Sequence, residues 1–191
     1  MTPEWIAAIA SLLTFFVIGA SAIAALVQLR HLKSSNELIA LNDFRQALES
    51  ERFQTAISEI QERLPALVAD PRFRKRLAAA NNLRELPELE PVIIVANLFE
   101  TLGGFVMHGM IDRNLVCQLW GRVIRPVWRM LAPLLANIRI AMESPTTWES
   151  FEYLAVLAQD FNAAHPLGSY PLNMRRAAPE TIWPELRSAA P

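Results

Sequence analysis

The chain has 191 residues, a formal net charge of −1, and 52% hydrophobic against 19% charged residues. This length suits one domain with an appendage, since domains usually contain roughly 100 to 200 residues, and the near-zero charge excludes the general electrostatic attraction to nucleic acid that a basic domain provides. The single cysteine, Cys117, excludes an intramolecular disulfide framework, and a charged fraction below the usual ~25% indicates a membrane segment.

The first predicted element is an apolar helix at the N-terminus. The 25 residues between Glu4 and Arg30 carry no charge, and a helix needs about 20 residues to cross ~30 Å of hydrocarbon. A secretory signal peptide is the alternative, because "ASA" at 20–22 resembles a cleavage site. However, no Lys or Arg precedes the apolar stretch, and it is longer than the ~7 to 15 residues of a signal h-region. We therefore expect residues 1–33 to form a retained transmembrane anchor.

The charges that flank this segment predict its orientation. Arg30, His31 and Lys33 follow the span, whereas Glu4 precedes it. The positive-inside tendency therefore places the N-terminus outside and the long C-terminal portion in the cytoplasm. Small residues four apart in the span permit close approach of two such helices, or occur by chance in an alanine-rich segment, so a homo-oligomer through the transmembrane and juxtamembrane helices is a hypothesis.

Residues 34–165 show helical periodicity and no strand pattern, which predicts an all-α bundle. A long acidic helix is expected over residues 37–64, either capped afresh by "KSSN" at 33–36 or continuous with the span. Pro65 and the Asp70–Pro71 pair are predicted to end it. The short basic helix "RFRKRLAAA" follows, and its charges are typical of a solvated, membrane-facing patch.

A strongly apolar helix is expected to begin at Pro91. Within residues 92–111 the only formally charged side chain is Glu100, and the run fits a second membrane span, a buried central helix, or the wall of an active site. Its polar residues Asn97, Glu100, Thr101, Gly104 and His108 share one face. Because Asn, Glu and His are costly in hydrocarbon, we expect a largely buried core helix.

The next helix is expected to follow a turn in which Gly109 is left-handed and Asp112 is the N-cap. Its apolar residues cover one half, and Arg122, Arg125, Arg129 and Arg139 lie on an arc beside them. Pro126 and Pro133 predict a bend, or two helices restarted at Pro126.

A final helix is predicted to open with a capping box between Thr146 and Glu149. The proline-rich residues 166–191 are expected to form a peripheral or disordered tail, with Tyr170 and Trp183 as docking points.

The candidate site is built around Glu100, because a carboxylate in a low-dielectric core must be paired or protonated. The arginines of the following helix are the obvious partners. This set is interpreted either as a polar network that fixes how two helices register or as a pocket with a functional carboxylate. The arginines alternatively bind phosphate, meet the acidic first helix, or face anionic lipid. The candidate residues are Asn97, Glu100, Thr101, His108, Arg122, Arg125 and Arg129.

Other chemistry is not indicated by the sequence. The histidines are far apart without ligand spacing, Cys117 has an apolar neighbourhood typical of an inert thiol, and "LGGF" at 102–105 lacks the features of a phosphate loop. Close helix packing at Gly103 and Gly104 explains this motif better. We therefore expect no catalytic residues, no metal, no cofactor and no nucleic-acid partner.

The segment "FETLGGFVMHGMIDRNLVCQLWG", followed by the Trp and Pro of "RPVWRMLAP", resembles the bacterial membrane-anchored family named only as domain of unknown function 4760. The resemblance extends over most of residues 5–160 and includes the apolar N-terminus and the acidic helix after it. It implies a protein of the bacterial inner membrane. It implies no activity and no catalytic residues.

These features together predict a single-pass membrane protein whose cytoplasmic helical bundle is an interaction or sensing module with an unknown protein partner. One alternative is a small membrane-tethered effector or enzyme that binds a phosphate-containing ligand through Glu100 and the arginine face. Another is a structural subunit of a membrane complex, which predicts an exposed apolar patch on the bundle.

Overall fold

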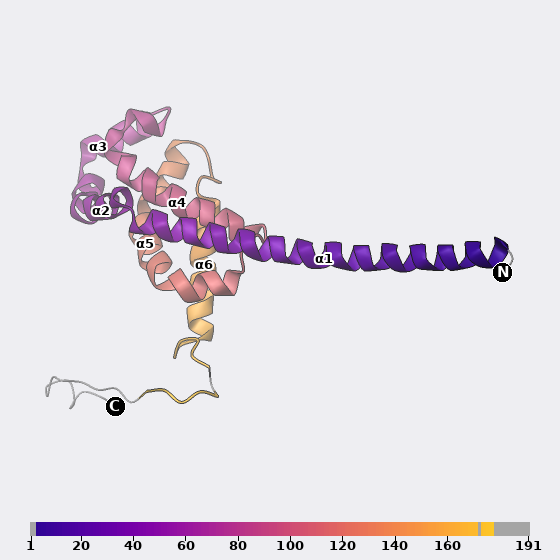
Figure 1. The fold of residues 1–191 in the computed structure, drawn as a ribbon. Helices are drawn as coiled ribbons and strands as arrows, with labels where there is room; N and C mark the ends of the chain where they lie inside the picture. Colours follow the sequence, from indigo (N-terminus) through magenta and orange to yellow (C-terminus); the bar gives the residue numbers. More distant parts are fainter. Residues whose placement is uncertain (1–2, 172, 178–191) are drawn as a thin grey trace.

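The computed structural model describes residues 3–171 and 173–177. This part of the chain is all-α, as predicted, and contains no strand (Figure 1). The helices are α1 (Pro3–Glu49), α2 (Glu51–Ala69), α3 (Pro71–Ala79), two short 3₁₀ helices (Leu83–Glu85 and Pro87–Leu89), α4 (Glu90–Met107), α5 (Arg113–Ala141) and α6 (Glu149–Ala164).

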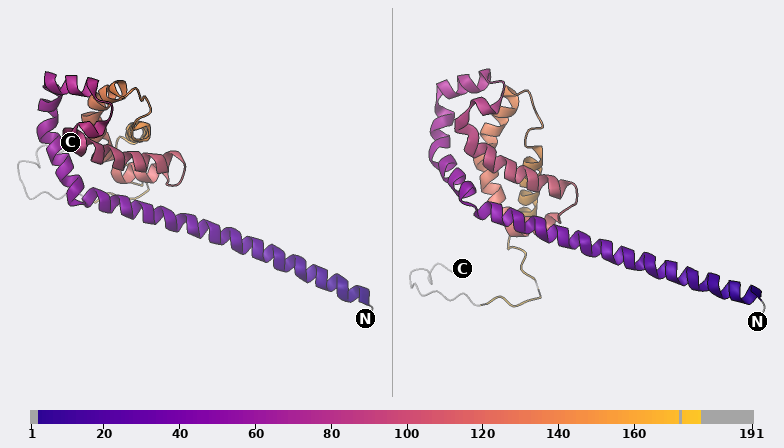
Figure 2. Two further views of the ribbon diagram at one scale, coloured as in Figure 1. Left: turned by 90° about the horizontal axis from the view of Figure 1, so that it is seen from above. Right: turned by 45° about the horizontal axis from the view of Figure 1, so that its top comes forward.

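Helix α1 is one unbroken rod that leaves the bundle along its N-terminal half (Figures 1 and 2). Its apolar window Leu12–Leu29 has a mean hydropathy of 2.2, and none of it is buried. The last turns of the same helix pack into the core through Leu41, Phe44 and Leu48. Of the two expectations for "KSSN" at 33–36, the continuous rod is therefore the one observed. By length and composition, the exposed part is a candidate membrane span or signal sequence.

The prediction of one helix over residues 37–64 is wrong in its middle, at Ser50, and at its C-terminal end. The chain breaks at Ser50, which is extended and accepts a hydrogen bond from the Phe53 N–H at 3.2 Å through its Oγ. Pro65 does not end α2 but lies inside it, because its ring faces solvent. The Asp70–Pro71 stop is confirmed: Asp70 ends α2 and caps α3, with its Oδ1 2.8 Å from the Arg72 nitrogen.

Helix α4 lies at the centre of the bundle, as expected for the run of residues 92–111. The second apolar window, Pro87–Met107, has a mean hydropathy of 1.5 and is 44% buried. The fully buried Phe99 ring joins α4 to three other helices. Its centroid lies 5.9 Å from that of Phe44 on α1, 6.2 Å from that of Phe53 on α2 and 4.9 Å from that of Phe151 on α6. The apolar surface of α4 is thus used in packing α1, α2 and α6.

The turn into α5 has the predicted chemistry. Gly109 has a φ of 66°, and Asp112 Oδ1 accepts from the Leu115 N–H at 2.8 Å. The left-handed conformation favours glycine because it has no Cβ. Helix α5 then continues through Pro126 and Pro133 without the restart that the prolines suggested.

The described part of the C-terminal tail has no helix or strand after Ala164. Tyr170 donates its hydroxyl hydrogen to the Arg175 carbonyl at 3.0 Å, and the Arg176 guanidinium carbon lies 4.8 Å from the Tyr170 ring centroid. Tyr170 thus contacts other tail residues. Trp183 lies outside the described residues.

Candidate functional site

The start of α6 lacks a side-chain cap of its own. Its N-cap residue is Trp148, which has a φ of 57° and makes no capping hydrogen bond with its side chain. The predicted capping box is wrong, because Thr146 lies before the N-cap and binds the Glu149 N–H with its carbonyl instead, at 3.1 Å. The first-turn N–H groups of a helix need an acceptor from elsewhere in such a case.

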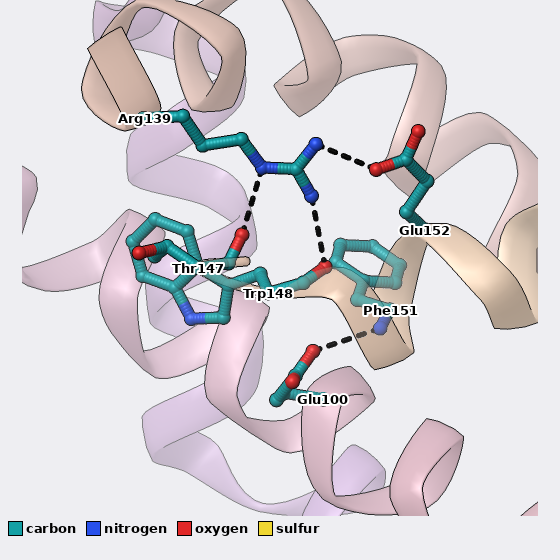
Figure 3. Close-up of polar contacts among 6 residues, drawn as sticks. All are labelled: Glu100, Arg139, Thr147, Trp148, Phe151 and Glu152. Atoms are coloured by element: carbon teal, nitrogen blue, oxygen red, sulfur yellow. Dashed lines mark hydrogen bonds and ion pairs between the residues drawn. The ribbon is translucent and has the colours of Figure 1, made fainter. Parts of the chain in front are cut away.

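Helix α4 supplies that acceptor. Glu100 Oε2 accepts a hydrogen bond from the Phe151 N–H at 2.8 Å (Figure 3). One turn earlier, Asn97 Oδ1 accepts from the indole Nε1 of Trp148, also at 2.8 Å. Residues three apart share a helix face, so α4 holds the beginning of α6 at two points. A carboxylate at this end is also favoured by the helix dipole.

Arg139 of α5 holds the same segment from another side. Its Nε donates to the Thr147 carbonyl at 2.8 Å and one terminal nitrogen donates to the Trp148 carbonyl at 3.3 Å. The other terminal nitrogen pairs with Glu152 Oε2 at 2.5 Å (Figure 3). These contacts hold Trp148 in a left-handed conformation that costs a non-glycine residue of order 1–3 kcal/mol. We call this cluster the α6 junction: Asn97, Glu100, Arg139, Thr147, Trp148, Phe151 and Glu152.

Close contact between α4 and α6 allows the junction to form. A Cβ added at Gly103 would lie 2.1 Å from the Ser150 carbonyl oxygen. The backbones therefore approach to a distance that only glycine permits, and this brings the short Glu100 side chain within reach of Phe151. The predicted close packing is confirmed at Gly103, whereas the nearest atom to a Cβ at Gly104 is Ser150 Oγ at 4.0 Å.

The predicted partners of Glu100 are not the ones observed. No ion pair between Glu100 and an arginine occurs among the described residues, and its carboxylate binds a main-chain N–H of α6 rather than the side chains of α5. Arg122 and Arg129 are exposed, and Arg125 donates its Nε to the Gly121 carbonyl at 3.3 Å. Glu100 is only half-buried, and a carboxylate can be satisfied by backbone donors as well as by cations, which is why the arginines were not required.

The remaining predicted residues lie outside the junction. Thr101 Oγ1 donates to the Asn97 carbonyl at 2.9 Å, and His108 is exposed at the end of α4. Conversely, the candidate set lacked Arg139, Trp148 and Glu152. The signal for Trp148 was its place directly before the acidic first turn of α6, where a capping residue is usual.

Three grooves lie beside α1, α2 and α4. Their volumes are about 840, 670 and 370 Å³. The largest is bounded by α2 and the start of α4 and carries both acidic and basic side chains, while the smallest is mostly apolar and lies between α1 and α4. Glu100, Arg125 and Arg129 line none of the three.

Reactive side chains in the described residues are sparse. No group of three or more His, Cys, Asp and Glu side chains there could hold a metal ion. Cys117 is 6% exposed. Burial raises the pKa of this thiol, and Asp112 adds to the increase while Arg113 opposes it. At neutral pH the nucleophilic thiolate is therefore scarce.

The fold and the α6 junction define a class: a helical bundle fixed by internal capping, to which a long, exposed apolar helix is joined. The chain belongs to the family described as Domain of unknown function (DUF4760), whose model matches residues 15–156. The match begins in the apolar window and ends in α6, so it includes the whole junction. No curated protein and no solved structure matches the chain.

Proposed function

We propose that this chain is a single-pass protein of the bacterial inner membrane, and that its cytoplasmic bundle is an interaction or sensing module. The unbroken α1 is the observation that carries the proposal. One end of the helix presents residues 12–29 as an apolar surface of which none is buried, and the other end contributes Leu41, Phe44 and Leu48 to the core. A helix that is both span and core element transmits a tilt or rotation in the bilayer to the bundle without an intervening linker.

The state of Glu100 supports a module over a phosphate-binding effector. A functional carboxylate is expected in a pocket with a free oxygen facing an arginine, whereas Glu100 caps α6 and lines none of the three grooves. The arginine face retains exposed Arg122 and Arg129, but without the carboxylate it is an ordinary basic helix surface. An internal strut is the role that the contacts of Glu100 support.

Topology is the first test of the proposal. The full chain should resist extraction from bacterial membranes by alkaline carbonate, and external protease should leave the bundle intact in spheroplasts, because Arg30 and Lys33 follow the span. Moving these two charges to positions before Trp5 should expose the bundle to protease. Complete release of the wild-type chain by carbonate would overturn the proposal.

Self-association is the second part of the proposal. Beyond the apolar window, α1 keeps Leu32, Leu38 and Ile39 more than half exposed, which is unusual for a solvated helix and suits contact with another α1. In membranes, Ile39→Cys should form an intermolecular disulfide under mild oxidation, and Ala79→Cys on α3 should not. Equal cross-linking at both positions would indicate random collision and a monomeric chain.

A further inference from the structure

The turn between α4 and α5 is the part of the bundle that reaches furthest along α1 towards its N-terminus. Figure 1 shows this turn beside α1 on the side of the bundle from which the rod leaves, and both views in Figure 2 agree. The direction of α4 explains the position. The Phe44 ring packs against Phe99 at 5.9 Å between centroids, whereas Glu37, seven residues earlier, contacts Asp112 beyond the end of α4, so α4 runs antiparallel to the last turns of α1.

A direct hydrogen bond fixes the turn to α1. The Asp112 N–H donates to Glu37 Oε1 at 2.7 Å, across 75 residues of sequence. Glu37 is thus engaged by Asp112, and the Asp112 side chain in turn accepts from the Leu115 N–H. Both acidic side chains in this region are therefore occupied by backbone donors. Glu37 and the apolar window belong to the same continuous helix, α1. The rise of this helix therefore gives the distance between the turn and the window.

That rise places the turn near the expected bilayer surface. Glu37 lies about 12 Å beyond Leu29 along the helix axis, at ~1.5 Å per residue. The polar layer of a bilayer is about 5–8 Å thick on each side of the hydrocarbon. The turn itself extends along α1 towards the N-terminus (Figure 1), and this brings it closer to the polar layer.

The side chains on the turn suit such a surface. Met107 and Met110 are 40% and 57% exposed, although the turn lies against a well-packed core. Unbranched methionine side chains adapt readily to irregular apolar surroundings. Arg113 is exposed next to them, and Arg30 and Lys33 stand in the sequence between the apolar window and Glu37. The three basic residues outnumber the two acidic residues Glu37 and Asp112, so the local formal charge is positive and favours an anionic leaflet.

We infer that the α4–α5 turn is a second membrane contact, in which Met107 and Met110 enter the headgroup layer of an anionic bilayer beside the anchor. The inference rests on the proposed function, because it takes residues 12–29 as the span. Two contacts with one leaflet fix the orientation of the bundle about the α1 axis, which a single helix does not. The basic α3 then lies at the end of the bundle away from the lipid, where a cytoplasmic partner can reach it (Figure 1).

Site-specific fluorescence quenching tests the contact in the full chain. A Cys117→Ala background would carry a single cysteine at Met110 or, as the matched control, at the exposed Ala79 on α3. Each variant would be labelled with an environment-sensitive dye and reconstituted into vesicles of phosphatidylcholine and phosphatidylglycerol containing a headgroup nitroxide lipid. Alkaline carbonate extraction of the same vesicles reports on insertion of the anchor independently.

The expected result is loss of fluorescence at position 110 and none at position 79, in vesicles that retain the chain after carbonate treatment. Equal quenching at the two positions in a carbonate-resistant sample would overturn the second contact and leave the anchor standing. Release of the chain by carbonate would overturn both, since the turn is placed at the bilayer by α1.

Discussion

Glu100 caps a helix to which it does not belong, and this determines what its replacement should cost. Its carboxylate is the side-chain acceptor for an N–H in the first turn of α6, and loss of an N-cap acceptor typically costs about 0.5–2 kcal/mol. Glu100→Ala should therefore lower the free energy of unfolding by about 1–2 kcal/mol, and Glu100→Gln should lower it less, because the amide oxygen still accepts while the charge is lost.

Urea denaturation of the detergent-solubilised chain, followed by circular dichroism, measures this difference. Glu149→Ala is the matched control: it removes an exposed acid from the same helix end and should change the stability by no more than ~0.5 kcal/mol. If Glu100→Ala were as stable as the wild type, the carboxylate would not be acting as a cap. The alternative hypothesis, that Glu100 belongs to a ligand-binding site, would then be favoured.

Cys117 predicts a pH dependence with a definite sign. Its pKa is raised in the folded chain, chiefly by burial, so the unfolded thiol loses its proton at a lower pH than the folded one. The stabilising contribution is complete below the unfolded pKa of ~8.5 and is lost as the pH rises through the raised folded pKa.

Unfolding free energies of the wild type and Cys117→Ala at pH 7.5 and pH 9.5 would measure this effect. The wild type should lose more stability than the variant over that interval. The comparison cancels titrations elsewhere in the chain, because they are common to both proteins. Parallel behaviour of the two proteins would mean that the thiol is solvated in the folded state.

At the scale of helices, the contact between α4 and α6 depends on one glycine. Gly103→Ala places a methyl group against the Ser150 backbone, which cannot rotate away as a side chain would. Overpacking usually costs about 1–3 kcal/mol, and here the shift would also withdraw Glu100 from Phe151. Gly104→Ala, one residue along, has open space and should stabilise the helix by up to ~1 kcal/mol. Opposite signs of ΔTm for this pair would support the close contact, and equal signs would refute it.

The helix boundaries that sequence predicted correctly are those coded by adjacent residues. Asp70 with Pro71 and Gly109 with Asp112 each combine a breaker with a cap, and Pro91 lies in the first turn of α4, so a few residues contain the whole signal. Ser50 was missed because the apolar periodicity continues across it, and a lone serine is also tolerated inside helices. The prediction that Pro65 ends the helix was wrong because a solvent-facing proline can remain in a helix when water binds the backbone carbonyl that loses its N–H partner.

The site was predictable in its location but not in its contacts. The polar stripe on α4 correctly drew attention to Asn97 and Glu100. Their partners are an indole and a backbone N–H that lie 51 residues further along the chain. Every residue except proline has such an N–H, so no pattern in side-chain types reveals which one a carboxylate will bind. The close approach of α4 to α6 at Gly103 determines which backbone N–H lies within reach of Glu100.

For the whole molecule, the decisive question is whether α1 is an appendage or part of the bundle. Its first half is exposed, but Leu41, Phe44 and Leu48 are buried, and the Phe44 ring centroid lies 4.8 Å from that of Trp120 on α5. Truncation of large buried side chains costs about 2–5 kcal/mol each, whereas a domain has about 5–15 kcal/mol in all. A chain that lacks all three should not hold a fixed core.

Two truncations separate the possibilities. Residues 30–191 retain the core turns of α1 and should unfold cooperatively, with near-ultraviolet circular dichroism from packed aromatic rings. Residues 50–191 lose those turns and should keep helical far-ultraviolet signal with little near-ultraviolet signal and no cooperative transition, as expected for a loosely packed state. If residues 50–191 instead unfolded cooperatively at the same urea midpoint, α1 would be a detachable tether. Motion in the bilayer would then not reach the bundle through its core, and the sensing function proposed above would lose its mechanical basis.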